Sequence, residues 1–329
     1  MTVPRGARPA DDHGRTGTVA DEIESLLETP EDANWNPTGD ILELARAKAN
    51  ENLAAALVQL GWSAYGAQAL ARTCVKPDDV RRRLAAPVEL RVPGGTMLVV
   101  ESPVSSHGVT SYPTNLREIG NRLYPLGIED NLAGNTLITD PVASPDAPSE
   151  LILDVSDQDQ LSERLRSSEA WLQRRNPLAD DVGVEGVLQP VTVVGMRIDH
   201  RNGAPSVHLL TAADGSSRTS ATHKILGADP ADLVNGIGSS DRMLRQQIGM
   251  ILRLLHEHGW SRLADEDRRR VRALTMPARI IVGYRQEAGR GVGFDAAVRS
   301  LIGLMHIAPP LPYGAEAGIR QSPVWCLAR

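Results

Sequence analysis

The chain has 329 residues, a formal net charge of −6 at pH 7, 41% hydrophobic residues and only 3% aromatic residues. This length indicates two domains or one large one. The acidic net charge argues against a protein that coats nucleic acid, although a local basic groove is compatible with that net charge. The two cysteines, Cys74 and Cys326, lie far apart. They indicate neither a disulfide framework nor a CxxC zinc site, and they favour a reducing cytoplasm as the setting.

The N-terminal part is expected to be helical after a short disordered start. Residues 1–16 are rich in Pro, Gly, Arg and Asp and lack the apolar stretch of a secretory signal, so we expect disorder there. Residues 17–86 form a helical section, in which residues 41–60 place apolar side chains three and four positions apart. Further helices are expected at 19–27, 64–72 and 77–84. No apolar run approaches the length that spans a bilayer, so we expect no membrane partner.

From residue 87 the pattern changes to short apolar runs that are typical of strands. Residues 88–92 and 97–101 flank Pro93-Gly94-Gly95 and predict a hairpin. Further strands are expected at 135–139, 151–155, 191–198, 206–212 and 279–284, helices at 115–123, 157–172, 178–186, 218–226, 241–258, 265–273 and 294–305, and a loop at 102–114. We assign residues 87–308 to one core with a helical C-terminal extension, and residues 309–329 to a tail.

The stretch at 211–227, TAADGSSRTSATHKILG, has the pattern of an anion site. A strand turns through Asp214-Gly215 into a short amphipathic helix, whose first N–H groups lack internal partners and lie at the positive end of the helix dipole. Gly215 allows close approach of a ligand, and Arg218 offers a planar fork suited to phosphate. Hydroxyl donors are supplied by Ser216, Ser217 and Thr219. An ordinary helix N-cap is the alternative interpretation of the same residues.

The order of motifs around this stretch resembles the ParB/sulfiredoxin superfamily. An Asn176-Pro177 entry precedes a short helix that ends at Gly186, then Gln189-Pro190 opens a strand, and the Gly215-Ser216-Ser217-Arg218 motif follows a hairpin. With Asp214 in front, that motif is similar to the DGQHR variant of DNA phosphorothioation regulators. The resemblance covers about residues 171–227. It implies an α+β (or α/β) fold with a mixed sheet, and it adds Gln189 and Pro190 to the expected phosphate site.

The chain departs from the family pattern at two places. Sulfiredoxins carry a catalytic cysteine where Ser216 stands, and a serine cannot supply thiolate chemistry, so we do not expect sulfiredoxin activity. Partitioning ParB proteins carry Glu-Arg where Ser216 and Ser217 stand, and a Glu-Asn-x-x-Arg helix that is missing after Gly227. Hydrolysis of CTP is therefore unsupported, whereas binding of a nucleoside triphosphate with Mg²⁺ stays open.

These observations lead to one functional hypothesis and two alternatives. The hypothesis is binding of a phosphate-bearing ligand, a nucleotide or a nucleic-acid backbone, in a DNA-linked regulatory, partition or defence role. One alternative is a nucleotide-hydrolysing or nuclease-type enzyme that uses Asp214 with a metal. The other is a degenerate fold that serves as a protein-interaction module. A protein partner or a homodimer is left open.

Two details stay undecided at this stage, and a third concerns metal binding. Arg218 either holds the phosphate or pairs with an acid such as Asp214. His223, one turn after Thr219, faces either the anion or the solvent. His200 and His208 lie on opposite arms of a hairpin, but no carboxylate or cysteine stands at ligand spacing from them, so we predict no metal site.

Overall fold

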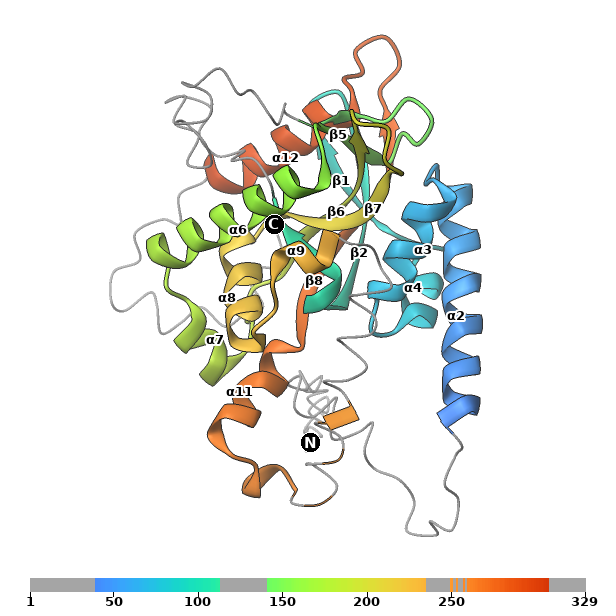
Figure 1. Cartoon of the computed structure of the whole chain (residues 1–329). Helices are drawn as coiled ribbons and strands as arrows, with labels where there is room; N and C mark the ends of the chain where they lie inside the picture. Colours follow the sequence, from blue (N-terminus) through green and yellow to red (C-terminus); the bar gives the residue numbers. More distant parts are fainter. Residues whose placement is uncertain are drawn as a thin grey trace, which may run out of the picture.

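The computed structural model describes residues 39–112, 141–234, 249–250, 253, 257 and 259–307 (Figure 1). These residues form an α+β fold, in which helices cover a mixed eight-stranded sheet, so the expected fold class is confirmed. The predicted segments 1–16, 19–27, 115–123, 135–139 and 309–329, and most of 241–258, lie outside the described residues. Among the described helices, none combines the length and apolar character needed to cross a bilayer.

The strands of the sheet come from both halves of the chain. They are β1 (Val88–Val92), β2 (Gly95–Ser105), β3 (Val109–Ser111), β4 (Val142–Ala143), β5 (Glu150–Val155), β6 (Val191–His200), β7 (Val207–Asp214) and β8 (Thr275–Gln286). The main order is β1-β2-β8-β6-β5-β4, and β7 pairs with β6 and β3. The β5–β6, β6–β8 and β3–β7 pairs are parallel, whereas the others are antiparallel. Strand β6 therefore holds three neighbours together.

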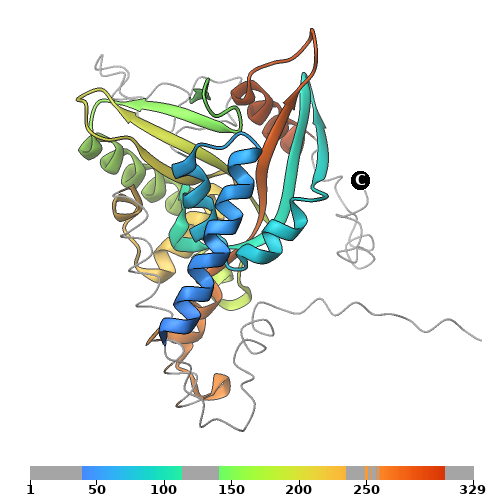
Figure 2. The same ribbon diagram turned by 90° about the vertical axis from the view of Figure 1, so that its right-hand side faces the viewer.

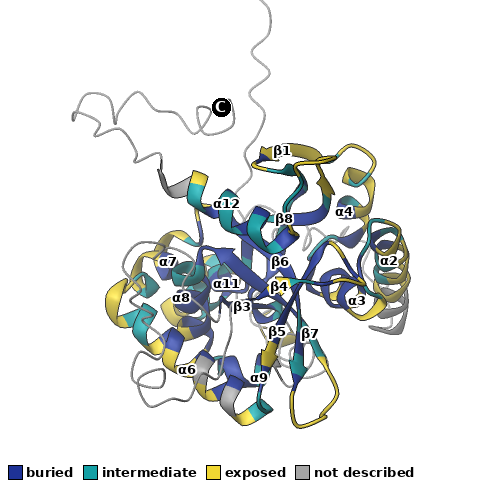
Figure 3. Cartoon of the chain, turned by 90° about the horizontal axis from the view of Figure 1, so that it is seen from above, coloured by how far each residue is buried: buried dark blue, intermediate teal, exposed yellow. Residues whose placement is uncertain are grey.

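The helices gather on both faces of this sheet (Figure 3). They are α2 (Gly39–Gln59), α3 (Ala64–Thr73), α4 (Pro77–Arg83), α6 (Gln158–Arg175), α7 (Ala179–Glu185), α8 (Ser216–Leu226), α9 (Pro230–Val234), α11 (Asp265–Ala273) and α12 (Phe294–Ile307), with 3-10 turns η1 (Ser106–Gly108) and η2 (Trp260–Arg262). Because successive strand residues point to opposite faces, β6 sends Val193 into one apolar cluster and Val194 into the other. The first cluster lies under α2, α3, α8 and α11, and the second lies under α6 and α12.

The N-terminal helices share a core with the sheet. Helix α2 packs against α3 and α4 on one side of the molecule (Figure 2). Leu53 and Leu57 of α2 are fully buried in the same apolar cluster as the strand residue Val282. Trp62, after α2, donates its indole N–H to the carbonyl oxygen of Val282 at 2.8 Å. The helical section is thus bound to the sheet by packing and by a buried hydrogen bond.

The loop expected at residues 102–114 is wrong over most of its described length. Strand β2 continues to Ser105, η1 follows, and β3 pairs with β7 in parallel. The polar side chains that suggested a loop are buried and bonded. The Ser106 hydroxyl donates to the Ala273 carbonyl at 2.6 Å, and the Thr110 hydroxyl donates to the Leu210 carbonyl at 3.2 Å. Tertiary partners therefore override the local composition here.

Candidate functional site

The turn between β7 and α8 has the geometry that the sequence predicts. Strand β7 ends at Asp214, Gly215 adopts a left-handed conformation with φ of +95°, and α8 begins at Ser216. A Cβ atom at Gly215 would lie 2.7 Å from Cγ1 of Val191 and 2.8 Å from Nη2 of Arg218. Glycine is therefore required twice, for its positive φ and for the close approach of β6 and Arg218.

Arg218 lies at this turn, where its side chain contacts those of Asp214 and Gln189. Its Nη2 is 3.1 Å from Oδ2 of Asp214, and its Nη1 donates to Oε1 of Gln189 at 2.9 Å. The Asp214 side chain is 8% exposed and that of Arg218 is 18% exposed. The pairing with Asp214, which the sequence left as one of two alternatives, is thus present. The carboxylate and the guanidinium compensate each other's charge in a largely desolvated place.

Residues distant in sequence meet at the first turn of α8. Asn176, at the end of α6, donates from Nδ2 to the Ser217 hydroxyl at 3.1 Å. Gln189, from the segment before β6, reaches Arg218. We call Asn176, Gln189, Ser217 and Arg218 the α8 rim. Asn176 and Gln189 are exposed and Ser217 and Arg218 are half-buried, so the rim combines amide, hydroxyl and guanidinium groups at a helix N-terminus that is partly open to solvent.

The remaining expected site residues have other environments. The Ser216 hydroxyl donates to the Ala212 carbonyl at 3.0 Å and accepts from the backbone N–H of Tyr112 at 3.1 Å. Thr219 is fully buried, and its hydroxyl donates to the Gly215 carbonyl at 3.3 Å. Both hydroxyls therefore hold the turn together and do not belong to the rim. Pro190 is half-buried directly before β6.

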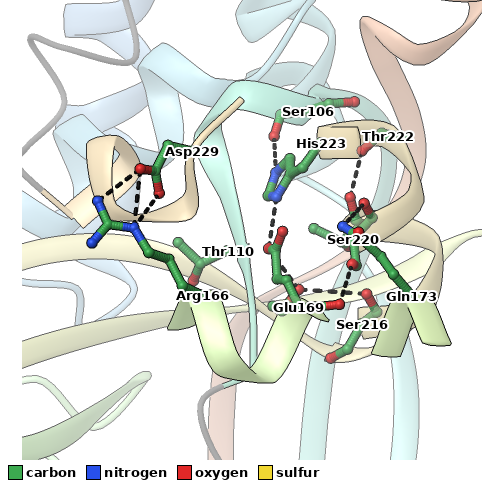
Figure 4. Close-up of polar contacts among 12 residues, drawn as sticks. Ser106, Thr110, Arg166, Glu169, Gln173, Ser216, Ser220, Thr222, His223 and Asp229 are labelled. Atoms are coloured by element: carbon green, nitrogen blue, oxygen red, sulfur yellow. Dashed lines mark hydrogen bonds and ion pairs between the residues drawn. The ribbon is translucent and has the colours of Figure 1, made fainter. Parts of the chain in front are cut away.

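His223 faces neither solvent nor the rim, because it is fully buried on the inner side of α8. Its Nδ1 lies 2.7 Å from Oε1 of Glu169 in α6, and its Nε2 donates to the Ser106 carbonyl at 2.9 Å (Figure 4). Glu169 is 3% exposed. Since a carbonyl oxygen only accepts, the Nε2 atom must carry a proton.

The charge state of His223 follows from these contacts. Burial alone would lower its pKa, but the charge and the hydrogen bond of Glu169, with the carbonyls of Ser106 and Val109, outweigh burial and raise the pKa of His223 above its ordinary value. A raised pKa favours an imidazolium paired with a carboxylate inside the protein. Such a pair is costly to break, because one charge would stay buried without compensation.

Further hydrogen bonds connect the buried pair of Glu169 and His223 to α8, the helix whose first turn carries the rim. The Ser111 hydroxyl of β3 donates to Oε1 of Glu169 at 3.0 Å and lies 3.5 Å from the carbonyl oxygen of Ser216. The Ser220 hydroxyl of α8 donates to the Glu169 carbonyl at 3.3 Å (Figure 4). Helix α8 is thus held against α6 and β3 along its length. This network fixes where the first turn of α8 lies.

Glu169 is the central residue of this network, and the sequence did not predict its role. It follows Leu165 by four positions, on the inward stripe of α6 that begins at Leu161. An acid on an apolar stripe is a signal that could have been used, since buried carboxylates are rare without a partner. Its partner His223 lies 54 residues later, and nothing local indicates that pairing.

A second polar cluster joins α3 to the sheet. The carboxylate of Glu150, 1% exposed, accepts the backbone N–H of Ser63 at 2.6 Å and the Ser63 hydroxyl at 3.1 Å. Nδ1 of His208 lies 3.3 Å from the same hydroxyl and 3.6 Å from Oε2 of Glu150. Since the serine and the carboxylate meet the same ring nitrogen, this is not the relay of a nucleophilic triad. Ser63 instead caps α3 by accepting from the Gly66 N–H at 3.0 Å.

The two hairpin histidines have different neighbours. His208 lies in the Glu150 cluster, whereas His200 contacts Gln158 at 2.8 Å and the Pro205 carbonyl at 3.0 Å. Within the described part of the chain, no three His, Cys, Asp or Glu side chains are grouped so that they could hold a metal ion. The Asp214 carboxylate, which the enzyme alternative requires, is engaged by Arg218.

Comparison with protein-family models, with curated proteins and with solved structures found no match to this chain.

Proposed function

We propose that the α8 rim binds a phosphate-bearing ligand, a nucleotide or a stretch of nucleic-acid backbone. The observation that supports this is the convergence of Asn176, Gln189 and Arg218 on the half-buried first turn of α8. Backbone N–H groups and the helix dipole favour an anion at such a turn. The resemblance to the ParB/sulfiredoxin superfamily, itself still a proposal, rests on the same residues and suggests a DNA-linked role.

The ion pair with Asp214 shapes how the ligand would bind. Because Arg218 neutralises that carboxylate, the nearby acid repels an anion less than a free carboxylate would. The backbone N–H groups of Arg218 and Thr219 already donate to the Gly215 carbonyl, so a phosphate would take hydrogen bonds from the N–H groups of Ser216 and Ser217. The Ser217 hydroxyl and the Asn176 amide would add to these, while Arg218 contributes from the side. Arg174 and Arg175, exposed at the end of α6 beside Asn176, add positive charge to the approach.

A panel of nucleotides and short oligonucleotides in a thermal-shift assay, with and without Mg²⁺, tests this function. A ligand that binds only the folded protein stabilises it by about 2.7 kcal/mol at a concentration of one hundred times Kd. We expect at least one phosphate-bearing compound to raise the melting temperature while its unphosphorylated nucleoside does not. An unchanged melting temperature across the panel at millimolar concentrations would contradict the proposal.

A protein-interaction module is the second candidate, and one observation favours it. Val184 and Leu188 are 57% and 75% exposed, and Leu188 directly precedes Gln189 of the rim. Exposed apolar side chains beside a polar group are common where a partner protein binds. Replacing both residues with serine should leave nucleotide binding unchanged but abolish the capture of a partner protein from lysate. If nucleotide binding were lost instead, Val184 and Leu188 would belong to the ligand-binding site.

A further inference from the structure

Strand β1 is an outer strand of the sheet (Figure 3). Among the described residues it pairs with β2 alone. Four of its five residues are exposed or half-exposed, and Val88 is 56% exposed. An open edge of this kind presents unpaired backbone groups to a further strand.

The direction of those backbone groups follows from the neighbouring strand. The Gly94 carbonyl accepts the Glu287 N–H at 3.0 Å, which places Gly94 among the residues bonded toward β8. Because hydrogen-bonding direction alternates along a strand, Gly95, Met97 and Val99 bond toward β1. Their partners in β1 are Val92, Leu90 and Val88.

It follows that Glu89 and Arg91 direct their N–H and C=O groups away from β2, toward the open edge. Their side chains share one face of the sheet, since they are two positions apart. Glu89 forms an ion pair with Arg285 on that face, and both side chains are more than half exposed. Arg91 is exposed.

We propose that two copies of this chain associate through β1, antiparallel and centred on Leu90, so that the two sheets become continuous. In that register Glu89 of one copy faces Arg91 of the other. The two-fold symmetry of the dimer also places Arg91 of the first copy opposite Glu89 of the second. The same two residues are those whose backbone groups point outward, so each facing pair exchanges two backbone hydrogen bonds. The partner is thus a second copy, bound by an isologous interface.

Charge complementarity selects this register over its neighbours. Moving the centre to Glu89 would place that carboxylate against its own copy and would set Arg91 against Pro87, which has no N–H to donate. Moving the centre to Arg91 would place two guanidiniums together. Opposite charges directly across an antiparallel pair are favourable and like charges are unfavourable. Charged residues on an edge strand also prevent unspecific pairing with other strands. Because Glu89 and Arg91 carry opposite charges, they still permit pairing of β1 with a second copy of itself in the register centred on Leu90.

Sedimentation velocity of the full chain, from about 1 µM to about 1 mM, measures the association. We expect a monomer–dimer equilibrium in the unchanged protein. Glu89→Arg should weaken it about tenfold, because two attractive pairs become repulsive. The charge swap Glu89→Arg/Arg91→Glu should restore it. Glu51→Arg, an exposed position on α2, is the matched control and should leave association unchanged.

Oxidative cross-linking tests the register itself. Leu90 faces its own copy in a non-hydrogen-bonded pair with Cα atoms about 4.5 Å apart, within the range of a disulfide. Leu90→Cys should therefore cross-link rapidly, whereas Glu89→Cys should not, and the unchanged chain oxidised in parallel accounts for Cys74 and Cys326. Thermal unfolding of each variant confirms that it is folded. The proposal would be overturned if the chain stayed monomeric at all concentrations, or if Glu89→Arg left the dimer unchanged. It would also be overturned if the charge swap failed to restore association, or if both cysteine variants cross-linked equally.

Discussion

Nδ1 of His223 lies 2.7 Å from Oε1 of Glu169, and both side chains are almost entirely buried between α8 and α6. His223 also donates to the Ser106 carbonyl, so both nitrogens of its ring are engaged. The pair anchors the inner side of the helix whose first turn carries the rim. Its charge makes the stability of the fold depend on pH.

Glu169→Gln should reverse part of that pH dependence. In the unchanged protein the raised pKa of His223 means that its contribution to the free energy of unfolding is full below about pH 6.5 and is lost as the pH rises through the folded pKa. Without the carboxylate, burial dominates and lowers the pKa of His223, so the histidine contribution is lost as the pH falls instead.

Urea unfolding between about pH 5 and about pH 9 measures this effect. At pH 6 the variant should be less stable by about 1–3 kcal/mol, with a smaller deficit at pH 9. Glu163→Gln, an exposed position on the same helix, is the control and should change little. Parallel pH curves for Glu169→Gln and the unchanged protein would show that the pair carries no charge.

Gly215→Ala should destabilise the protein more than Gly203→Ala. Both glycines have positive φ, +95° and +81°, so alanine is strained at each. Only at Gly215 would the new Cβ also meet Val191 and Arg218, whereas no atom lies within 4 Å at Gly203. We expect a loss of about 1 kcal/mol at Gly203 and about 2–3 kcal/mol at Gly215, measured by chemical denaturation. Equal losses of stability would mean that Val191 of β6 and Arg218 move to make room for the new Cβ atom without a cost in free energy.

Gly66→Ala should destabilise, although alanine in place of glycine usually stabilises a helix by about 0.5–1 kcal/mol. A Cβ at Gly66 would overlap the carboxylate of Glu150, which also receives two hydrogen bonds from Ser63. Gly303→Ala in α12 is the matched control, because no atom lies within 4 Å of its position, and it should stabilise. Comparison of the two melting temperatures checks the prediction, and a gain for both variants would contradict it.

Arg218→Ala should lower stability in the absence of ligand, because it removes the guanidinium whose charge compensates the buried Asp214 carboxylate. A loss of about 1–3 kcal/mol is expected. Since the two side chains interact, Arg218→Ala/Asp214→Ala should cost less than the sum of the single changes, by about 0.5–3 kcal/mol. A double-mutant cycle by urea unfolding measures this coupling. Additive losses would show that the pair contributes nothing to the fold.

Local pattern predicted much of this fold, because helices and hairpins are set by nearby residues. The helix at 265–273, the hairpin around Gly94 and the turn at Asp214-Gly215 all follow from spacing and turn chemistry. Strand β3 was missed because it has only three residues and pairs with β7 about one hundred positions later in the chain. Its register depends on tertiary contacts that no local window contains.

The candidate site was predicted in part for the same reason. The turn at Gly215 and the four-residue spacing of Asp214 and Arg218 are visible in the sequence. The meeting of Asn176 with Ser217, across 41 positions, was not predicted, because nothing in either segment indicates the other. The inward orientation of His223 depends on Glu169 from another helix, and helical periodicity alone does not assign that partner.

The Ser217→Asp variant tests the central claim, that the first turn of α8 binds phosphate. A carboxylate in the first turn interacts favourably with the helix dipole, so the empty protein should be as stable as before or gain about 0.3–1 kcal/mol. The same carboxylate would repel a phosphate. Ser261→Asp, an exposed position in η2, is the matched control.

The decisive measurement is calorimetric titration of both variants with the phosphate-bearing compound that stabilises the unchanged protein. The account predicts that Ser217→Asp loses binding by at least about tenfold with its melting temperature kept or raised, while Ser261→Asp binds normally. Unchanged affinity in Ser217→Asp would place the ligand elsewhere and contradict the account.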